Sequence, residues 1–402
     1  MTQICASRAK AEVHDASLTL CFAARSVGEV SETWMWRQIV GMARMRVQVL
    51  TWRYINKDFF PIGSVPMTIM QEAGCWPEEA SGLMRRLHRL RNLSRRNFFA
   101  TTRREYAAIG RIVRAIHPDV ILCQYGTMGL RMLPIARELA IPLAVHFHGS
   151  DLAGGLANRW YRWSIEAALR RFDAVIVVNT MQRDWLVAHG VDPARVHVIP
   201  CGVPTEESLP CSAKERSGSP LQFIVVSRLV RLKGVDMTIR AFASVVREIP
   251  GARLVIAGEG PERGDLETLV ERLGLWDNVC FTGWLSPSEV RHALEQSDVF
   301  VQHSLVPEGW PVSVAEASAM GLPVVVTNCG GLAEQVVDGV TGLLVPAGDV
   351  PRMQESMLRL ARDPHLRSRL GMAGRTRIKE EFDVKKQIAE LEDVLIECAR
   401  AS

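Results

Sequence analysis

Residues 308–327 read EGWPVSVAEASAMGLPVVVT. Pro311 stands where a first-turn proline begins a helix, because its fixed φ suits that position and its missing N–H is not needed there. The apolar run over residues 323–327 is typical of a buried strand. A loop, a helix and a buried strand in this order form the repeating unit of a parallel α/β sheet.

The same alternation of apolar runs and helix-length segments continues in both directions from this stretch. It indicates parallel sheets covered by helices. In the first half we expect strands over residues 18–22, 47–52, 120–123, 143–147, 174–178 and 196–199. In the second half we expect strands over residues 221–226, 253–257, 279–282, 299–302, 323–327 and 342–345, followed by helical patterns over residues 349–380 and 383–400.

The 402 residues exceed one ordinary core and suit two α/β domains. The stretch CGVPTEESLPCSAKERSGSP over residues 201–220 has no periodicity and is rich in Pro, Ser and charge, as interdomain linkers are. We therefore predict an N-terminal domain over 1–205, a linker over 206–219, a C-terminal domain over 220–380 and a helix over 381–402 that packs back towards the first domain. Two doubly wound sheets arranged in this way place a ligand cleft at the carboxyl ends of their strands.

Composition excludes several classes of protein. Residues are 48% hydrophobic and 23% charged, and no apolar run reaches the roughly 18 residues that a spanning helix needs. The first residues, MTQICASRAKAEVHD, place charges where a signal peptide is apolar. The nine cysteines are scattered without a Cys-x-x-Cys pair, and the net charge is a modest +4. We expect a cytoplasmic protein with no cysteine-based metal site and no nucleic-acid partner.

A basic segment lies between Arg85 and Arg104, where eight arginines and no acidic residue are interleaved with leucine and phenylalanine. As a helix it would present a basic amphipathic face suited to an anionic membrane surface or an anionic acceptor. It would equally suit a solvated arginine-rich helix packed by its leucines. The sequence leaves both interpretations open.

Glu308 and Glu316 flank the start of the predicted helix, one in the preceding loop and one on the helix. The free amides and the dipole of that helix start favour an anion between the two carboxylates. One carboxylate could then meet a sugar and the other a ribose, with phosphate between them. Alternatively, Glu308 lies on a surface loop and Glu316 on a solvated helix face, and neither binds a ligand.

Arg228 and Lys233 follow the strand at residues 221–226, in the stretch SRLVRLKG. An arginine and a lysine at the carboxyl end of a strand could hold a diphosphate, although surface cations are a fair rival interpretation. The chain contains no Asp-x-Asp, so no metal clamp is expected there. Gly258 and Gly260 follow the next strand in GEGPERG, a defective dinucleotide fingerprint that argues against NAD but permits close approach to a nucleotide or a plain turn.

Two loops of the first half also lie at the ends of predicted strands. His148 begins HGSD, where it could hydrogen-bond a sugar hydroxyl or a phosphate, or serve as a structural loop histidine. Gly28 lies in RSVGEVSETWMW and permits close backbone approach. We expect Ser31 to cap the following helix, with Glu32 in its first turn.

Taken together, the segments resemble the retaining glycosyltransferases of the GT-B fold, family 4. The resemblance rests on SETW, HGSD, VIPCGV, SRLVRLKG, IAGEGPE, FTGWL and the long stretch beginning EGWPVSVAE, which occur in the family's order along essentially the whole chain. SETW is similar to the subgroup that makes exopolysaccharide, colanic acid and lipopolysaccharide. The chain departs from the family pattern at Cys201, which replaces an Asn, at Trp310, which replaces a Phe, and at His303–Ser304, which replaces a Pro-Ser pair.

The resemblance implies a function and a set of residues. The chain would transfer a sugar, with retention and without a metal or other cofactor, from a UDP- or GDP-sugar to a glycan or lipid-linked acceptor, at the inner face of the membrane if the basic segment binds there. Glu308 would contact the transferred sugar, Glu316 the ribose, and His148 the donor sugar or phosphate. Arg228, Lys233 and the amides of Gly309 and Trp310 would bind the diphosphate. Gly28 would line the acceptor loop, and Trp284 or Leu285 would lie near the base.

Other activities share parts of this pattern. A nucleotide-sugar 2-epimerase or a phosphorylase would use the same kind of cleft, but no lysine-bound cofactor motif supports a phosphorylase. A catalytically silent scaffold subunit would not need Glu308, Glu316, Arg228, Lys233 and His148 together. These alternatives rank below the transferase.

Overall fold

A computed structural model describes residues 18–72, 96–97, 99, 101–206 and 220–401. The chain divides into two compact units, the first formed by Met1–Ile199 with Ile388–Ser402 and the second by Pro200–Gln387. The sequence placed these divisions after residues 205 and 380. Residues 207–219 of the expected linker and residues 85–95, 98 and 100 of the basic segment lie outside the described residues.

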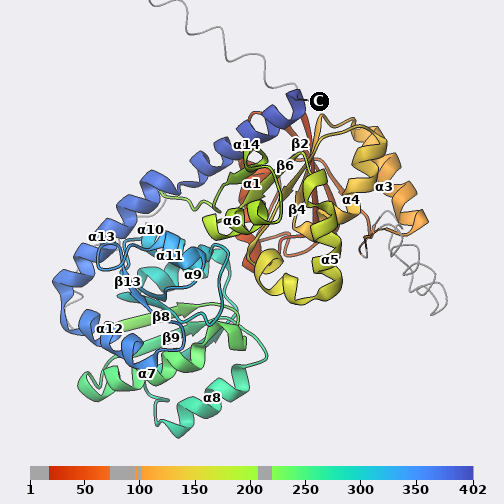
Figure 1. The fold of residues 1–402 in the computed structure, drawn as a ribbon. Helices are drawn as coiled ribbons and strands as arrows, with labels where there is room; N and C mark the ends of the chain where they lie inside the picture. The colour runs from red at the N-terminus through yellow and green to blue at the C-terminus, as the bar shows by residue number, and fades with distance from the viewer. Residues whose placement is uncertain (1–17, 73–95, 98, 100, 207–219, 402) are drawn as a thin grey trace, which may run out of the picture. The chain divides into compact units, whose positions relative to one another are not determined.

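The first unit contains a sheet of seven parallel strands in the order β3-β2-β1-β4-β5-β6-β7. Figure 1 labels β2, β4 and β6 of this sheet. The strands are β1 (Thr19–Val27), β2 (Arg46–Tyr54), β3 (Met67–Ile69), β4 (Val120–Gln124), β5 (Leu143–His146), β6 (Ala174–Val177) and β7 (Val196–Val198). Six of them confirm the predicted strands. The sequence missed β3, because three half-buried residues give too short an apolar run.

Helical segments connect most of these parallel strands, whereas residues 55–66 join β2 to β3 without one. The helical segments are η1 (Val30–Glu32), α1 (Thr33–Gly41), α3 (Arg103–Ile116), α4 (Gly126–Glu138), η2 (Ser150–Gly154), η3 (Gly155–Ala157), α5 (Arg159–Ala168), η4 (Leu169–Arg171), α6 (Thr180–Ala188) and η5 (Pro193–Arg195). The expected cap at Ser31 is wrong. Ser31 lies inside the short helix η1, whose turn is closed by a bond from the Glu32 amide to the Glu29 carbonyl at 2.9 Å, so α1 begins only at Thr33.

The second unit contains six parallel strands in the order β10-β9-β8-β11-β12-β13. The strands are β8 (Gln222–Val226), β9 (Arg253–Ala257), β10 (Val279–Gly283), β11 (Val299–Gln302), β12 (Val324–Thr327) and β13 (Leu343–Val345). The helical segments before α12 are η6 (Arg231–Lys233), α7 (Val235–Glu248), α8 (Arg263–Arg272), α9 (Pro287–Glu295), α10 (Val312–Ala319) and α11 (Gly331–Gln335). All six predicted strands are confirmed.

The helical pattern at residues 349–380 is two helices rather than one. α12 (Val350–Arg362) ends before Asp363, and α13 (Pro364–Glu381) begins directly after it. Pro364 has no N–H to continue the first helix, and the Asp363 carboxylate accepts from the Leu366 amide at 2.9 Å as the cap of the second. The last pattern is α14 (Val384–Arg400), whose residues from Ile388 onward belong to the first unit.

The strand order reverses direction between β1 and β4 in the first sheet and between β8 and β11 in the second. The loops that follow these four strands therefore leave each sheet at a topological switch point, where open α/β sheets bind their ligands. The central strands are buried on both faces, since β4, β5 and β6 of the first sheet and β11 and β12 of the second are buried along their whole length. Among the described residues, no helix is both long and apolar enough to cross a membrane.

Candidate functional site

In the second unit, the loops after β8 and β11 meet at the switch point. Gly234, with φ of 52°, ends η6 in a left-handed conformation. A side chain there would place its Cβ 2.2 Å from the His303 carbonyl oxygen, so only glycine lets these two loops lie together. This close approach brings Lys233, at the end of η6, to Glu308.

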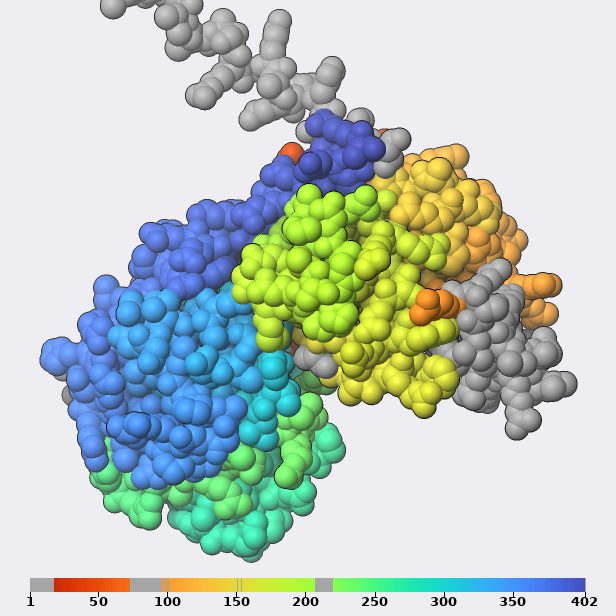
Figure 2. Space-filling view, in the orientation of Figure 1, coloured from red at the N-terminus to blue at the C-terminus, as the bar shows by residue number. Residues whose placement is uncertain are grey.

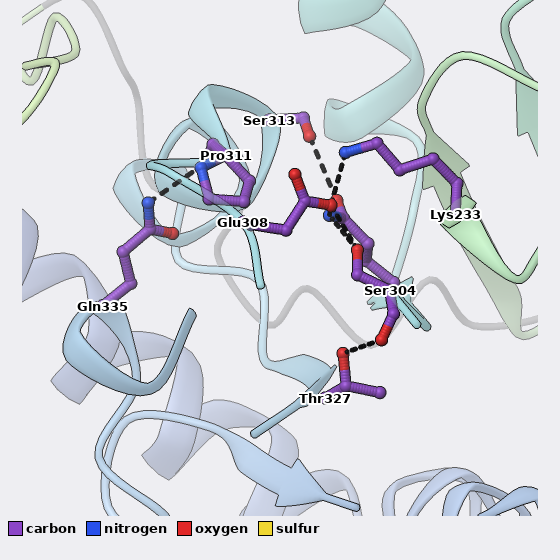
Figure 3. A network of polar contacts seen from close by, with 8 residues as sticks. Lys233, Ser304, Glu308, Pro311, Ser313, Thr327 and Gln335 are labelled. Atoms are coloured by element: carbon purple, nitrogen blue, oxygen red, sulfur yellow. Dashed lines mark hydrogen bonds and ion pairs between the residues drawn. The ribbon is translucent and has the colours of Figure 1, made fainter. Parts of the chain in front are cut away.

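Glu308 receives hydrogen bonds from three side chains at the same carboxylate oxygen, Oε1 (Figure 3). The Lys233 ammonium lies 2.5 Å away and the Gln302 amide 3.1 Å away, and the Ser304 hydroxyl also donates. The side chains of Lys233 and Glu308 are each 17% exposed, so water shields the pair only in part. The carboxylate is therefore charge-compensated and fixed in orientation.

Neighbouring strands hold this network in place. The Thr327 hydroxyl at the end of β12 donates to the Ser304 carbonyl at 2.9 Å (Figure 3). The Glu308 carbonyl accepts from the Gly331 amide at 2.9 Å. Sequence reasoning missed Gln302 and Ser304 as partners of Glu308. The signal available was the polar run Gln302–Ser304 at the carboxyl end of a buried strand.

His303 precedes Ser304 in the pair that departs from the family pattern, and its side chain makes a hydrogen bond that supports the fold. Its Nε2 accepts a hydrogen bond from the Gly348 amide at 2.9 Å, and burial lowers the pKa of its imidazole. His303 thus ties the loop after β13 to the loop after β11 as a neutral side chain.

The placement predicted for the two glutamates is confirmed. Pro311 is the N-cap of α10, so Glu308 lies in the preceding loop and Glu316 lies half-buried on the helix. Gly309 and Trp310 stand between Glu308 and Pro311. The Trp310 ring is buried 4.6 Å from the ring of Phe382, which leaves its backbone amide as the group that a ligand could meet.

Arg228 lies exposed in the loop after β8, and its guanidinium forms no hydrogen bond or ion pair with any residue that the structure describes. The two glycines after β9 support this loop. A Cβ at Gly258 would lie 1.9 Å from the Ser227 carbonyl oxygen, and one at Gly260 would lie 2.2 Å from that of Leu229. The structure thus explains these glycines by close approach of the Arg228 loop.

Trp284 and Leu285 occupy the loop between β10 and α9. β10 is the edge strand, two strands from β8. Trp284 is 40% exposed and Leu285 is half-buried. A large exposed aromatic ring at a strand's carboxyl end suits stacking with a base, which remains a prediction.

In the first unit, His148 is buried in a cluster of aromatic and amide side chains. Its ring stacks on that of Trp34 with centroids 3.7 Å apart, and its Nε2 lies 3.0 Å from Gln124 Oε1. The Gln124 amide donates in turn to Gln38 Oε1 at 2.9 Å, which makes Gln124 Oε1 the acceptor and places the imidazole proton on Nε2. SETW and HGSD, far apart in sequence, are therefore in contact.

His148 carries no charge at neutral pH in this environment. Burial lowers its pKa well below the ordinary value, and the neighbouring His146 lowers it further. Burial also lowers the pKa of His146 to about 3. A neutral imidazole suits hydrogen bonding to a sugar hydroxyl better than neutralisation of phosphate.

Asp151, the last residue of HGSD, connects three segments through its buried carboxylate. Its Oδ1 accepts from the Gly126 amide and the Tyr161 hydroxyl, each at 3.1 Å, and its Oδ2 accepts from the His148 amide at 2.9 Å. Burial raises the pKa of this carboxyl to about 7, although the hydrogen bonds lower it in part. Asp151 thus fixes the backbone that carries His148.

Tyr125 follows β4 in a backbone conformation that residues with side chains seldom adopt, φ 71° and ψ 146°. Its hydroxyl donates to Glu32 Oε1 at 2.5 Å. Gly28, after β1, has φ of 87°, and a Cβ there would lie 2.0 Å from the Ile55 carbonyl oxygen. Sequence reasoning missed Tyr125, whose position after a buried strand was the available signal.

No cluster of three or more His, Cys, Asp or Glu side chains that could hold a metal ion occurs in the described part of the chain. Of the four charged residues predicted for the second unit, the structure brings Lys233 and Glu308 into contact, whereas Arg228 lies in the loop after β8 and Glu316 on α10.

Comparisons with known proteins match both halves of the chain. A family model described as Glycosyl transferases group 1 matches residues 212–377, and one described as Glycosyltransferase Family 4 matches residues 67–207. The chain is 30% identical to a putative colanic acid biosynthesis glycosyltransferase, WcaL, of Salmonella typhimurium, over 68% of this chain and 70% of that protein. It is 31% identical to a GDP-mannose-dependent alpha-(1-6)-phosphatidylinositol monomannoside mannosyltransferase of Mycobacterium tuberculosis, over 72% of this chain and 84% of that protein.

Among solved structures, Anabaena Alr3699/HepE in complex with UDP and glucose is similar with a TM-score of 0.76. The alignment covers 94% of this chain and 99% of that chain at 17% identity, a likeness of fold.

Proposed function

This chain belongs to the group 1 glycosyl transferases and has the two Rossmann-like units of the GT-B fold, and from this premise we propose its reaction. It transfers a hexosyl group from a UDP- or GDP-sugar to a glycan or lipid-linked glycan in surface polysaccharide synthesis. Transfer occurs with retention at the anomeric carbon and needs no metal. The Lys233–Glu308 pair at the switch point of the second sheet carries this proposal.

The leaving nucleoside diphosphate requires positive charge. Lys233 and the exposed guanidinium of Arg228 lie in the loop after β8, and the amides of Gly309 and Trp310 precede α10. Arg binds phosphate with two parallel hydrogen bonds, and a helix start favours an anion. These groups supply the positive charge that the leaving diphosphate needs.

The contacts of Glu308 suit an orienting role. Because Oε1 accepts hydrogen bonds from Lys233, Gln302 and Ser304, the carboxylate is a weak nucleophile. That supports hydrogen bonding to the transferred sugar over formation of a covalent intermediate. Diphosphate binding would draw Lys233 away from Glu308, so that the arriving anion replaces the carboxylate as the partner of the ammonium.

Glu316 on α10 is the proposed partner of the ribose hydroxyls, because a carboxylate accepts two hydrogen bonds from a vicinal diol. In the first unit, the neutral His148 is the proposed partner of a sugar hydroxyl. The family relatives named above act, by their names, in colanic acid synthesis and on a phosphatidylinositol mannoside, which supports a glycan or lipid-linked acceptor. We place the enzyme peripherally at the cytoplasmic face of the membrane.

Donor binding tests the proposal. Titration with UDP, GDP and their common hexose derivatives, in EDTA, should give micromolar binding of one nucleotide series and slow hydrolysis of one sugar. Glu316→Ala should weaken binding of the free nucleotide and of its sugar derivative alike, by about 100-fold or more, because two hydrogen bonds to a charged group contribute roughly 3 kcal/mol or more. Glu308→Gln should leave the affinity for the free nucleotide unchanged and should slow hydrolysis of the nucleotide-sugar.

Arg240 on α7 is an exposed charged residue with no proposed role in the site, so it provides a control. Arg240→Ala should bind the nucleotide as the wild type does. Absence of binding to every nucleotide would refute the transferase. Binding followed by 2-epimerisation of the sugar, with no transfer or hydrolysis, would assign the site to an epimerase instead.

A further inference from the structure

Helix α5 presents tryptophan and arginine side chains on its outward face. Tyr161, Ser164, Ile165 and Ala168 are buried against the first unit. The opposite face carries Arg159, Trp160, Arg162, Trp163 and Glu166. Trp160 is 39% exposed, and the yellow region of Figure 2 shows this part of the chain at the surface.

Two guanidinium groups on this surface lie over tryptophan rings. The Arg159 guanidinium is 4.6 Å from the centroid of the Trp160 ring, and that of Arg96 is 5.6 Å from the Trp163 ring. Arg162 Nε pairs with Glu166 at 2.8 Å, which occupies the one carboxylate of α5. Three arginines face one glutamate, so the surface has a net positive charge. We refer to Arg96, Arg159, Trp160, Arg162 and Trp163 as the α5 surface.

We propose that the α5 surface binds the anionic headgroups of a lipid bilayer. Guanidinium groups grip phosphate in pairs of hydrogen bonds, and the indole ring of tryptophan suits the headgroup level, where one end is apolar and the other wet. Arginine beside exposed tryptophan supplies both contacts. A glycan-binding surface would offer aromatic rings together with free carboxylates or amides. The one carboxylate of α5 is already paired with Arg162, so the surface suits a bilayer better than a glycan.

The position of α5 in the first unit connects membrane binding to the proposed acceptor side of the reaction. The Tyr161 hydroxyl on its inner face donates to Asp151, and Asp151 accepts from the His148 amide. The α5 surface is thus joined to the proposed sugar-binding histidine through two hydrogen bonds. This purpose, although not the binding itself, rests on the proposed function, because a lipid-linked acceptor would then be presented near His148.

Vesicle flotation of the full chain tests the proposal. At about 0.1 M salt, wild-type protein should float with vesicles that contain 30% phosphatidylglycerol and should not float with pure phosphatidylcholine. Arg96→Gln with Arg159→Gln should weaken partitioning about 25-fold, at about fivefold for each arginine near the surface. Trp160→Ala should weaken it further without changing charge.

Controls of equal charge and size lie on the second unit. Arg240→Gln with Arg272→Gln removes two exposed arginines, and Trp276→Ala removes a ring that is exposed to a similar degree. Both should float within twofold of wild type. Circular dichroism and thermal unfolding confirm that each variant is folded.

The proposal is overturned if wild type does not float with the anionic vesicles, or if the α5 variants float as wild type does. It is also overturned if soluble polygalacturonate, and no vesicle, shifts the fluorescence of wild type but not of Trp160→Ala, which would assign the surface to a glycan. Nucleotide binding by wild type separates the two proposals. Nucleotide binding without flotation leaves the donor site standing, and flotation without nucleotide binding leaves the membrane surface standing.

Discussion

The indole ring of Trp34 lies stacked on the imidazole of His148, with 3.7 Å between their centroids and 28° between their planes. Trp34 comes from α1 and His148 from the loop after β5. Because Gln124 on the intervening strand β4 fixes the Nε2 side of the histidine, the ring has little freedom to turn. The orientation of His148 is therefore set by Trp34 of the SETW motif together with Gln124.

Replacing Trp34 should affect the first unit and spare the donor site. Trp34→Ala removes a buried aromatic side chain and should lower the free energy of unfolding by about 3 kcal/mol. Trp34→Phe, which keeps an aromatic ring against the histidine, should lose less than half of that. Urea unfolding followed by circular dichroism measures the change, and nucleotide binding should remain at the wild-type level. Equal stability of the two variants would show that the stacking is unimportant.

Variants of Lys233 and Arg228 should differ in stability, although both residues are proposed to bind the diphosphate. Lys233→Ala leaves a partly buried carboxylate with only neutral donors, and should cost about 1 kcal/mol of unfolding free energy. Arg228→Ala removes an exposed side chain and should change stability by less than about 0.5 kcal/mol. Calorimetric titration should show weaker nucleotide binding in both.

The double variant Lys233→Ala with Glu308→Ala provides the control for this pair. It should regain stability relative to Lys233→Ala alone, because no unpaired carboxylate remains. A cycle with zero coupling would contradict the ion pair.

Alanine at Gly258 should displace the Arg228 loop. Its Cβ would fall 1.9 Å from the Ser227 carbonyl oxygen, and φ of 145° is itself strained for alanine. We expect a loss of about 2 kcal/mol or more in unfolding free energy, together with weaker nucleotide binding. Gly264→Ala, where no atom lies within 4 Å of the new Cβ, is the matched control and should behave as wild type.

Asp151 should give stability a dependence on pH. Its pKa is about 7 when folded, against an ordinary 3.8, so the folded protein binds the proton more tightly than the unfolded chain does. This group's contribution is therefore greatest below about pH 4 and is lost as pH rises to about 7. Between pH 5 and 8 the free energy of unfolding of wild type should fall by about 2–3 kcal/mol relative to Asp151→Asn.

Comparison with that variant isolates Asp151 from His146, whose pKa of about 3 has the opposite effect. A buried neutral histidine gains stability as pH rises towards its ordinary pKa of 6.5. Because both proteins retain His146, its contribution cancels. A constant difference between wild type and Asp151→Asn across this pH range would show that the carboxyl is ionised throughout.

The strands and the order of the motifs could be predicted because apolar runs and turn residues are local signals. The contacts of the site could not. Nothing in SRLVRLKG indicates that Lys233 bonds Glu308, because that pairing depends on Gly234 lying against the His303 carbonyl in the folded chain. The charge of His148 likewise depends on burial beside His146, which no spacing reveals.

Glycines illustrate the same limit. The sequence around Gly258 and Gly260 predicts either close approach to a nucleotide or a plain turn, and it does not indicate that another loop lies against them. The Ser227 and Leu229 carbonyls lie where their side chains would be. A pattern therefore identifies the need for a small residue, and the tertiary structure identifies the neighbour.

The division of the first unit between two distant stretches of chain has a consequence for its synthesis. Ile388, Leu391 and Leu395 of α14 are buried, and Glu392 accepts from the Arg44 amide at 2.7 Å. The ribosome delivers residues 388–402 only after the whole second unit has been made. The unit that begins first is thus completed last, and a nascent chain must keep the surface around Arg44 uncovered until then.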